Sequence, residues 1–133
     1  MRLYPKYTCA SPFAGMEKRP FGRTGLEVSA IGFGCWEIGG GYGQIEAAEF
    51  ARAVGRALDL GINCFDTAEG YGGGASERAL GKALGRRRRD AIVVTKFGIG
   101  YREKPNLRDA SRVRCMACIE KSLENLGDRK SVV

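Results

Sequence analysis

Three side chains that could together move a proton follow apolar segments of this chain. The apolar stretch over residues 62–65 is followed by Asp66, and the glycine-rich loop behind it contains Tyr71. A second apolar stretch, over residues 91–95, is followed by Lys96. A phenol is a poor acid because its ordinary pKa is about 10, but a nearby ammonium stabilises the phenolate and a carboxylate keeps that ammonium charged. The set could therefore protonate a carbonyl oxygen whose carbon receives a hydride.

Each of these residues also has a structural reading. An aspartate at a strand end often caps a turn, and a lysine there is often simply solvated. Three such groups at successive strand ends favour the functional reading.

The elements that would position these residues alternate along the chain. Strands are expected over residues 30–36, 62–65 and 91–95, and helices over 45–60, 76–84 and 109–126. Such units recur about every thirty residues, which predicts the α/β class with a parallel sheet. Before them, residues 18–21 and 26–29 flank a four-residue turn and predict a hairpin. Residues 37–44 and 97–107 are expected to be loops.

The predicted helices have apolar faces and end at glycines. The faces comprise Phe50, Val54, Ala57 and Leu58 in the first helix, Leu80, Ala83 and Leu84 in the second, and Val113, Met116, Ile119, Leu123 and Leu126 in the third. The glycines expected to end them are Gly61, Gly85 and Gly127. Ser76 is expected to cap the second helix at its start.

Two architectures with a parallel sheet are compatible with this pattern. A doubly wound dinucleotide-binding fold has three spaced glycines in a tight turn between its first strand and the following helix. This sequence has Gly32 and Gly34 but no third glycine, and the predicted helix follows about ten residues later. In a (β/α)8 barrel, functional residues gather after the carboxyl ends of the strands, which favours the barrel. That barrel typically needs roughly 250 residues, so 133 residues supply three units of eight.

Composition excludes several classes of function. The net charge of +7 comes largely from the arginine run 86–89, which lacks interleaved aromatic residues and is read as a solvated loop rather than a nucleic-acid surface. No apolar run is long enough to span a membrane. Five cysteines without an N-terminal export signal indicate reduced thiols in the cytoplasm. The sequence contains no histidine, and its scattered cysteines predict no metal site.

Three further residue groups have simpler readings. Cys115 and Cys118 match a C-x-x-C pattern, but they fall within a predicted helix and are expected to be ordinary helix residues. Trp36 could belong to the barrel core or to the wall of a substrate pocket. Glu69 is read as a solvated loop residue.

A family resemblance rests on the same stretch that contains Asp66 and Tyr71. Residues 61–72, followed by Ser76, Glu77, Leu80 and Gly81, resemble the signature of the aldo-keto reductase family. The hairpin, the first strand and the segment 94–96 are similar to that family in order and spacing, over about residues 17–127. The resemblance implies a (β/α)8 TIM barrel of the NADP-dependent oxidoreductase type, of which only the N-terminal hairpin and the first three βα units are present.

The resemblance also implies roles for individual residues. Tyr71 would be the proton donor, Lys96 would tune it, and Asp66 would pair with Lys96. Gly34, Cys35, Trp36 and Asp66 would face the nicotinamide end of NADPH, or of NADH. The implied activity is reduction of aldehyde or ketone carbonyls of a small molecule, with no nucleic acid, membrane or metal as partner.

The chain also departs from the family pattern. The family has a fourth catalytic residue, a histidine after its fourth strand, and this sequence has none. Charged residues 129–130 stand where an apolar strand is expected. The main expectation is a truncated reductase domain over residues 16–133 with little activity alone, behind a disordered extension over residues 1–15. The alternatives are a non-catalytic, barrel-type binding or regulatory subunit and a truncation product without function.

Overall fold

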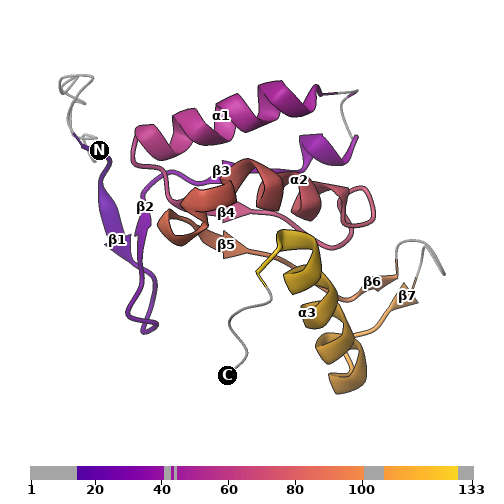
Figure 1. Ribbon diagram of the computed structural model, residues 1–133. Coiled ribbons are helices and arrows are strands. Elements are labelled where there is room, and N and C mark those ends of the chain that lie inside the picture. The colour runs from indigo at the N-terminus through magenta and orange to yellow at the C-terminus, as the bar shows by residue number, and fades with distance from the viewer. Residues whose placement is uncertain (1–14, 41–42, 44, 101–106, 129–133) are drawn as a thin grey trace, which may run out of the picture.

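A computed structural model describes residues 15–40, 43, 45–100 and 107–128 of the chain (Figure 1). It begins with an antiparallel hairpin of β1 (Lys18–Pro20) and β2 (Glu27–Ser29), which confirms the predicted hairpin. The turn uses Gly22 at φ 58° and Gly25 at φ 77°, backbone conformations that favour glycine. The predicted extension lies, except for Gly15, outside the described residues.

Three parallel strands form the centre of the fold. They are β3 (Phe33–Gly34), β4 (Cys64–Asp66) and β5 (Ile92–Val94), side by side in that order. Each is shorter than the sequence predicts. The parallel sheet confirms the α/β class, and the described residues form a small α/β unit rather than a closed barrel.

Three α-helices follow the strands in turn. They are α1 (Ala47–Asp59), α2 (Ala75–Leu84) and α3 (Arg112–Leu126), and α2 packs between the other two (Figure 1). Gly61 at φ 85° follows α1 and Gly127 at φ 69° follows α3, as the glycine pattern predicts. Each helix within the described ranges is too short or too polar to cross a bilayer.

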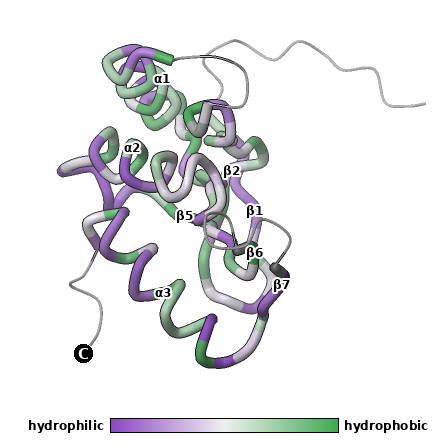
Figure 2. Tube along the Cα trace, turned by 90° about the vertical axis from the view of Figure 1, so that its right-hand side faces the viewer, coloured by the Kyte–Doolittle hydropathy of each residue, from purple (hydrophilic) through white to green (hydrophobic). Residues whose placement is uncertain are grey.

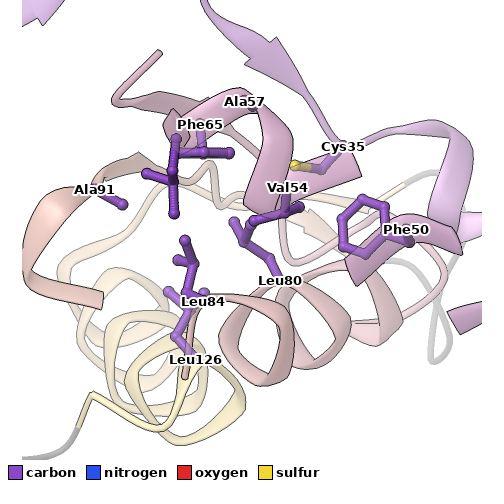
Figure 3. Close-up of a cluster of buried hydrophobic side chains, with 10 residues drawn as sticks. Cys35, Phe50, Val54, Ala57, Phe65, Leu80, Leu84, Ala91 and Leu126 are labelled. Carbon is purple, nitrogen blue, oxygen red and sulfur yellow. The ribbon is translucent and has the colours of Figure 1, made fainter. Parts of the chain in front are cut away.

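The core lies between the sheet and the helices (Figure 3). Successive side chains of a strand point to opposite faces, and Phe65 in β4 is fully buried on the helix side. It pairs across the sheet with Phe33 and Val93, which pack against the same cluster. From the helices come Phe50, Val54, Ala57, Leu58, Leu80, Leu84 and Leu126. The apolar faces predicted for α1 and α2 therefore form the core, with Ala83 at its edge.

The hairpin is tied to the amino end of β4 through one side chain. Asn63 Oδ1 accepts from the Ser29 backbone N–H at 2.7 Å, and Asn63 Nδ2 donates to the Glu27 carbonyl at 2.9 Å. Asn63 precedes β4, whereas Asp66 ends it. The hairpin therefore lies at the end of the strand opposite to the carboxylate.

The predicted cap of α2 is wrong. Gly74, at φ 84°, occupies the N-cap position, and Ser76 lies inside the helix and is fully buried. Its hydroxyl donates to the Cys35 carbonyl at 2.6 Å and contacts the Thr67 hydroxyl at 2.9 Å. A Cβ on Gly74 would lie 2.6 Å from Asn125 Nδ2, so glycine permits α3 to approach the start of α2.

The described parts of the predicted loops contain short strands and helices. Residues 97–107 were expected to form a loop, but β6 (Ile99–Gly100) and β7 (Leu107–Arg108) pair there as an antiparallel ladder. Two short 3-10 helices, η1 (Glu37–Gly39) and η2 (Gly85–Asp90), occupy the other predicted loops. In η2, Arg87 pairs with Asp59 at 2.6 Å and Arg88 with Asp128 at 2.6 Å, so the arginine run is not simply solvated.

The predicted core face of α3 is only partly correct. Val113 is 82% exposed, and Met116 and Ile119 are about half exposed. Leu126 is buried as predicted, and the helix also buries Cys118 and Ser122. Gly81 of α2 explains part of this choice, since a Cβ there would lie 2.5 Å from the Leu126 carbonyl oxygen. Figure 2 shows hydrophobic and hydrophilic segments alternating along α3.

Candidate active site

The candidate site forms where β4 and β5 end beside each other. Asp66 pairs with Val94 across the sheet, and Lys96 follows β5 by two residues. The Lys96 ammonium nitrogen lies 2.9 Å from Asp66 Oδ1 and 2.7 Å from Oδ2. Asp66 points away from the helix-covered face, because its neighbour Phe65 points into the core. The sheet thus separates its packed face from the face with the ion pair.

Tyr71 lies beside this ion pair. The Lys96 ammonium nitrogen stands 4.9 Å from the centroid of the Tyr71 ring, within the range of a cation–π contact. The tyrosine is positioned by its backbone, since its N–H donates to the Ala68 carbonyl at 3.1 Å and its carbonyl accepts from the Ser76 N–H at 3.2 Å. The structure therefore brings together all three residues that the strand ends predict to share a site.

The Lys96 ammonium is stabilised in its charged form. Partial burial alone would lower the pKa of Lys96, but its hydrogen bonds with Asp66 and Tyr71, together with their charges, raise that pKa above the ordinary value. A positive charge is therefore maintained next to the Tyr71 ring. The ammonium and the carboxylate remain open to solvent, with the side chains of Lys96 and Asp66 46% and 50% exposed.

The end of β3 forms the third side of the site. A Cβ on Gly34 would meet no atom within 4 Å, and Trp36 is 47% exposed. Gly34 pairs with Asp66 across the sheet, so open space adjoins that carboxylate. A flat ring could approach the backbone there, and the contact of Gly34, Trp36 and Asp66 with a nicotinamide stays a prediction.

Cys35 lies elsewhere than this predicted contact requires. It is 1% exposed within the core, its N–H donates to the Asp66 carbonyl at 2.9 Å, and its own carbonyl accepts from Ser76. Burial, followed by the charges of Asp66 and Glu37, raises the pKa of Cys35 to about 12. Its neutral thiol is a packing group.

A small cavity adjoins Tyr71 and Lys96. Its volume is about 200 Å³, and Phe97 and Ile99 contribute an apolar wall. A larger cavity of about 510 Å³ lies between β3 and the start of α1, next to Gly34. Groups of three or more potential metal ligands are absent from the part of the chain that the structure describes.

The sequence alone does not indicate the surroundings of two carboxylates near the site. Glu77 is fully buried in α2, where it accepts from the Thr95 hydroxyl at 2.7 Å and from Asn125 Nδ2 at 2.8 Å. Its spacing to Leu80 and Leu84 places it on the apolar face of that helix, which is a signal that it is buried. Glu69 is not the solvated residue that was predicted, because its side chain is only 14% exposed.

Known proteins are similar to most of this chain. The family model described as the aldo/keto reductase family matches residues 30–130. The chain is 44% identical over 114 residues to L-galactose dehydrogenase of Arabidopsis thaliana, a match that covers 84% of this chain and 34% of that protein. It is 40% identical over 113 residues to a Schizosaccharomyces pombe protein named as a beta subunit of voltage-gated potassium channels, covering 82% of this chain and 33% of that protein.

A solved structure of an aldo-keto reductase is also similar to this chain. The fold superposes on the aldo-keto reductase AKR11C1 of Bacillus halodurans, in its holo form, with a TM-score of 0.73 and 34% identity, over 84% of this chain and 37% of that one. The chain spans about a third of the length of the curated relatives named above. Since the family model matches most of its residues, the chain belongs to the aldo/keto reductase family.

Proposed function

We propose that this chain contributes the proton-donor side of an NAD(P)H-dependent carbonyl reductase, with Tyr71 as the acid. The observation that carries the proposal is the position of the Lys96 ammonium, between the Asp66 carboxylate and the Tyr71 ring. An ammonium beside a phenol stabilises the phenolate that remains after proton transfer. Asp66 in turn keeps Lys96 charged and oriented.

The chain's own residues have separate roles in this proposal. The Tyr71 hydroxyl donates a proton to the oxygen of an aldehyde or ketone, which becomes the hydroxyl of an alcohol. When bound, NADPH supplies the hydride, and NADH would serve the same chemistry. Gly34, Trp36 and Asp66 are the residues that would hold the nicotinamide end. We place the protein in the cytoplasm, with its cysteines reduced and a small carbonyl compound as substrate.

We further propose that the 133 residues alone turn over little substrate. Lys96 and Asp66 are about half exposed, so water competes for their hydrogen bonds and weakens the charge interactions on which the phenol depends. Positioning of the two reactants supplies much of an enzyme's rate, and the open face of the sheet gives little of it. Appreciable NADPH-dependent reduction of an aromatic aldehyde by the purified chain would contradict this statement.

A chimera tests the role of Tyr71 directly. Residues 16–128 would replace the matching segment of L-galactose dehydrogenase, and the chimera would be compared with its Tyr71→Phe variant. We expect the variant to lose on the order of 10²–10⁴-fold in kcat for aldehyde reduction, the usual contribution of a general acid. Equal turnover of the two chimeras would reject Tyr71 as the donor.

The second candidate is a binding or regulatory subunit that uses the same barrel without catalysis. It is favoured by the likeness to a protein named as a potassium-channel beta subunit. The same chimera separates the two functions. Binding of NADPH without turnover in either Tyr71 form would support the regulatory subunit.

A further inference from the structure

Glu69 links the loop that contains Tyr71 to the segment that contains Lys96. It lies three residues after Asp66 and two before Tyr71, in the turn between β4 and α2. Its backbone N–H donates to the Lys96 carbonyl at 3.1 Å. Its carboxylate oxygen Oε1 accepts from the Gly98 N–H at 3.1 Å. Glu69 therefore forms hydrogen bonds with the residues on both sides of Phe97.

Two side chains of α3 also contact the Glu69 carboxylate. Arg114 Nη2 lies 3.6 Å from Glu69 Oε1, and the Cys118 thiol hydrogen-bonds with the same carboxylate. The side chains of Glu69 and Arg114 are 14% and 30% exposed, so this pair is better shielded from water than Asp66 with Lys96. Burial, then the hydrogen bond with Glu69 and its charge, raises the pKa of Cys118 to about 11, so the thiol remains a neutral donor.

These contacts bear on the distance between the phenol and the ammonium. Lys96 contacts Asp66 and Tyr71 through its side chain, and such contacts between partly exposed groups hold geometry poorly. The bonds of Glu69 to Lys96 O and Gly98 N–H instead fix the backbone from which the lysine side chain extends. We propose that Glu69 is a positioning residue, which holds the Tyr71 loop and the Lys96 segment in a fixed arrangement through Gly98, Arg114 and Cys118.

The significance of this clamp for catalysis rests on the proposed function, but the clamp itself is measurable without cofactor or substrate. The experiment uses the 133-residue chain labelled for NMR and records two quantities. One is the rate of hydrogen exchange at the Gly98 amide, and the other is the midpoint at which the Lys96 amine titrates. Glu69→Ala removes the hydrogen-bond acceptor. Glu69→Asp keeps the charge on a shorter side chain, and Glu69→Gln keeps a neutral acceptor on a side chain of the same length.

We expect the Gly98 amide to exchange about tenfold faster in Glu69→Ala and Glu69→Asp, because a lost hydrogen bond exposes it more often. The Lys96 midpoint is expected to fall in the same two variants, since the ammonium is no longer held against Asp66 and Tyr71. Glu69→Gln should stay close to the original chain in both quantities. Glu120→Gln, an exposed glutamate on α3, is the matched control and should change neither.

If Glu69→Ala fails to fold, Glu69→Asp decides the question, because it retains the charge that faces Arg114. A folded Glu69→Asp chain with unchanged Gly98 exchange and an unchanged Lys96 midpoint would overturn the proposal. In the active chimera, Glu69→Asp should lower kcat more than it alters KM. Failure of the chimera to turn over would count against the reductase function alone, since both NMR quantities are independent of it.

Discussion

The two faces of the three-stranded sheet differ in how completely they are covered. On the helix side, Phe65 and Leu80 are fully buried, and the tilted ring of Phe33 packs against Phe65 with ring centroids 5.6 Å apart. On the other side, Asp66 and Lys96 are about half exposed. Stability and chemistry therefore reside on opposite faces of the same strands. The packed face can position the groups of the open face without shielding them from water.

The largest expected effect comes from removing the aromatic ring at the centre of the packed face. Phe65→Ala should lower the free energy of unfolding by about 3–5 kcal/mol, the loss typical of a buried phenylalanine. Urea denaturation followed by circular dichroism measures it. Val113→Ala, at a residue that is 82% exposed, is the control and should change the value by less than about 0.5 kcal/mol. Similar losses in both variants would contradict the central packing role of Phe65.

The next effect concerns the buried carboxylate that links the packed face to the end of β5. Glu77→Ala would leave the Thr95 hydroxyl and the Asn125 amide without their acceptor, which should lower the free energy of unfolding by about 1–3 kcal/mol. Glu77→Gln keeps one carbonyl acceptor and should lose less. The same urea titration applies. An unchanged midpoint for Glu77→Ala would show that the two hydrogen bonds contribute nothing.

A smaller effect is expected from the ion pair on the open face. Asp66→Asn should change the free energy of unfolding by no more than about 1 kcal/mol, because exposed ion pairs contribute little. The raised pKa of Lys96 sets the sign of the pH dependence. The stabilisation is complete below the pKa of lysine in the unfolded chain, about 10.4, and disappears as the pH rises through the higher folded value.

Denaturation at a series of alkaline pH values checks this dependence. The difference between the original chain and Asp66→Asn should shrink as the pH passes the Lys96 pKa. A difference that grows in the same range would mean that the ion pair does not stabilise the protonated lysine.

The smallest effect on stability is expected at the apolar surface of α3. Ile119→Lys should leave the free energy of unfolding within about 0.5 kcal/mol of its original value, since Ile119 is 46% exposed. Val113 and Met116 lie on the same predicted face, and apolar patches of this kind favour association. Sedimentation velocity should therefore show less self-association in the variant. Equal association of both chains would contradict a role for this surface.

Much of the fold could be predicted because local patterns and global structure agree. The apolar positions of α1 and α2 repeat with helical spacing and face the sheet, so periodicity alone identified Phe50, Val54, Leu80 and Leu84 as core residues. The same periodicity was only partly correct in α3. Leu126 is buried as predicted, but the other core-facing residues are Cys118 and Ser122, because the orientation of the helix depends on contacts with other elements, such as the close approach of the Leu126 backbone to Gly81.

Part of the candidate site could likewise be predicted from the sequence, and part could not. Apolar strands followed by Asp66 and Lys96, with a glycine-rich loop holding Tyr71, placed three groups at one edge of a parallel sheet from spacing alone. Parallel strands align their carboxyl ends, so sequence order was sufficient for that prediction. Glu69, Ser76 and the cap at Gly74 depended on partners in other elements, such as Asn125 and Arg114. Local sequence contains no information on such contacts, and only the tertiary structure decided them.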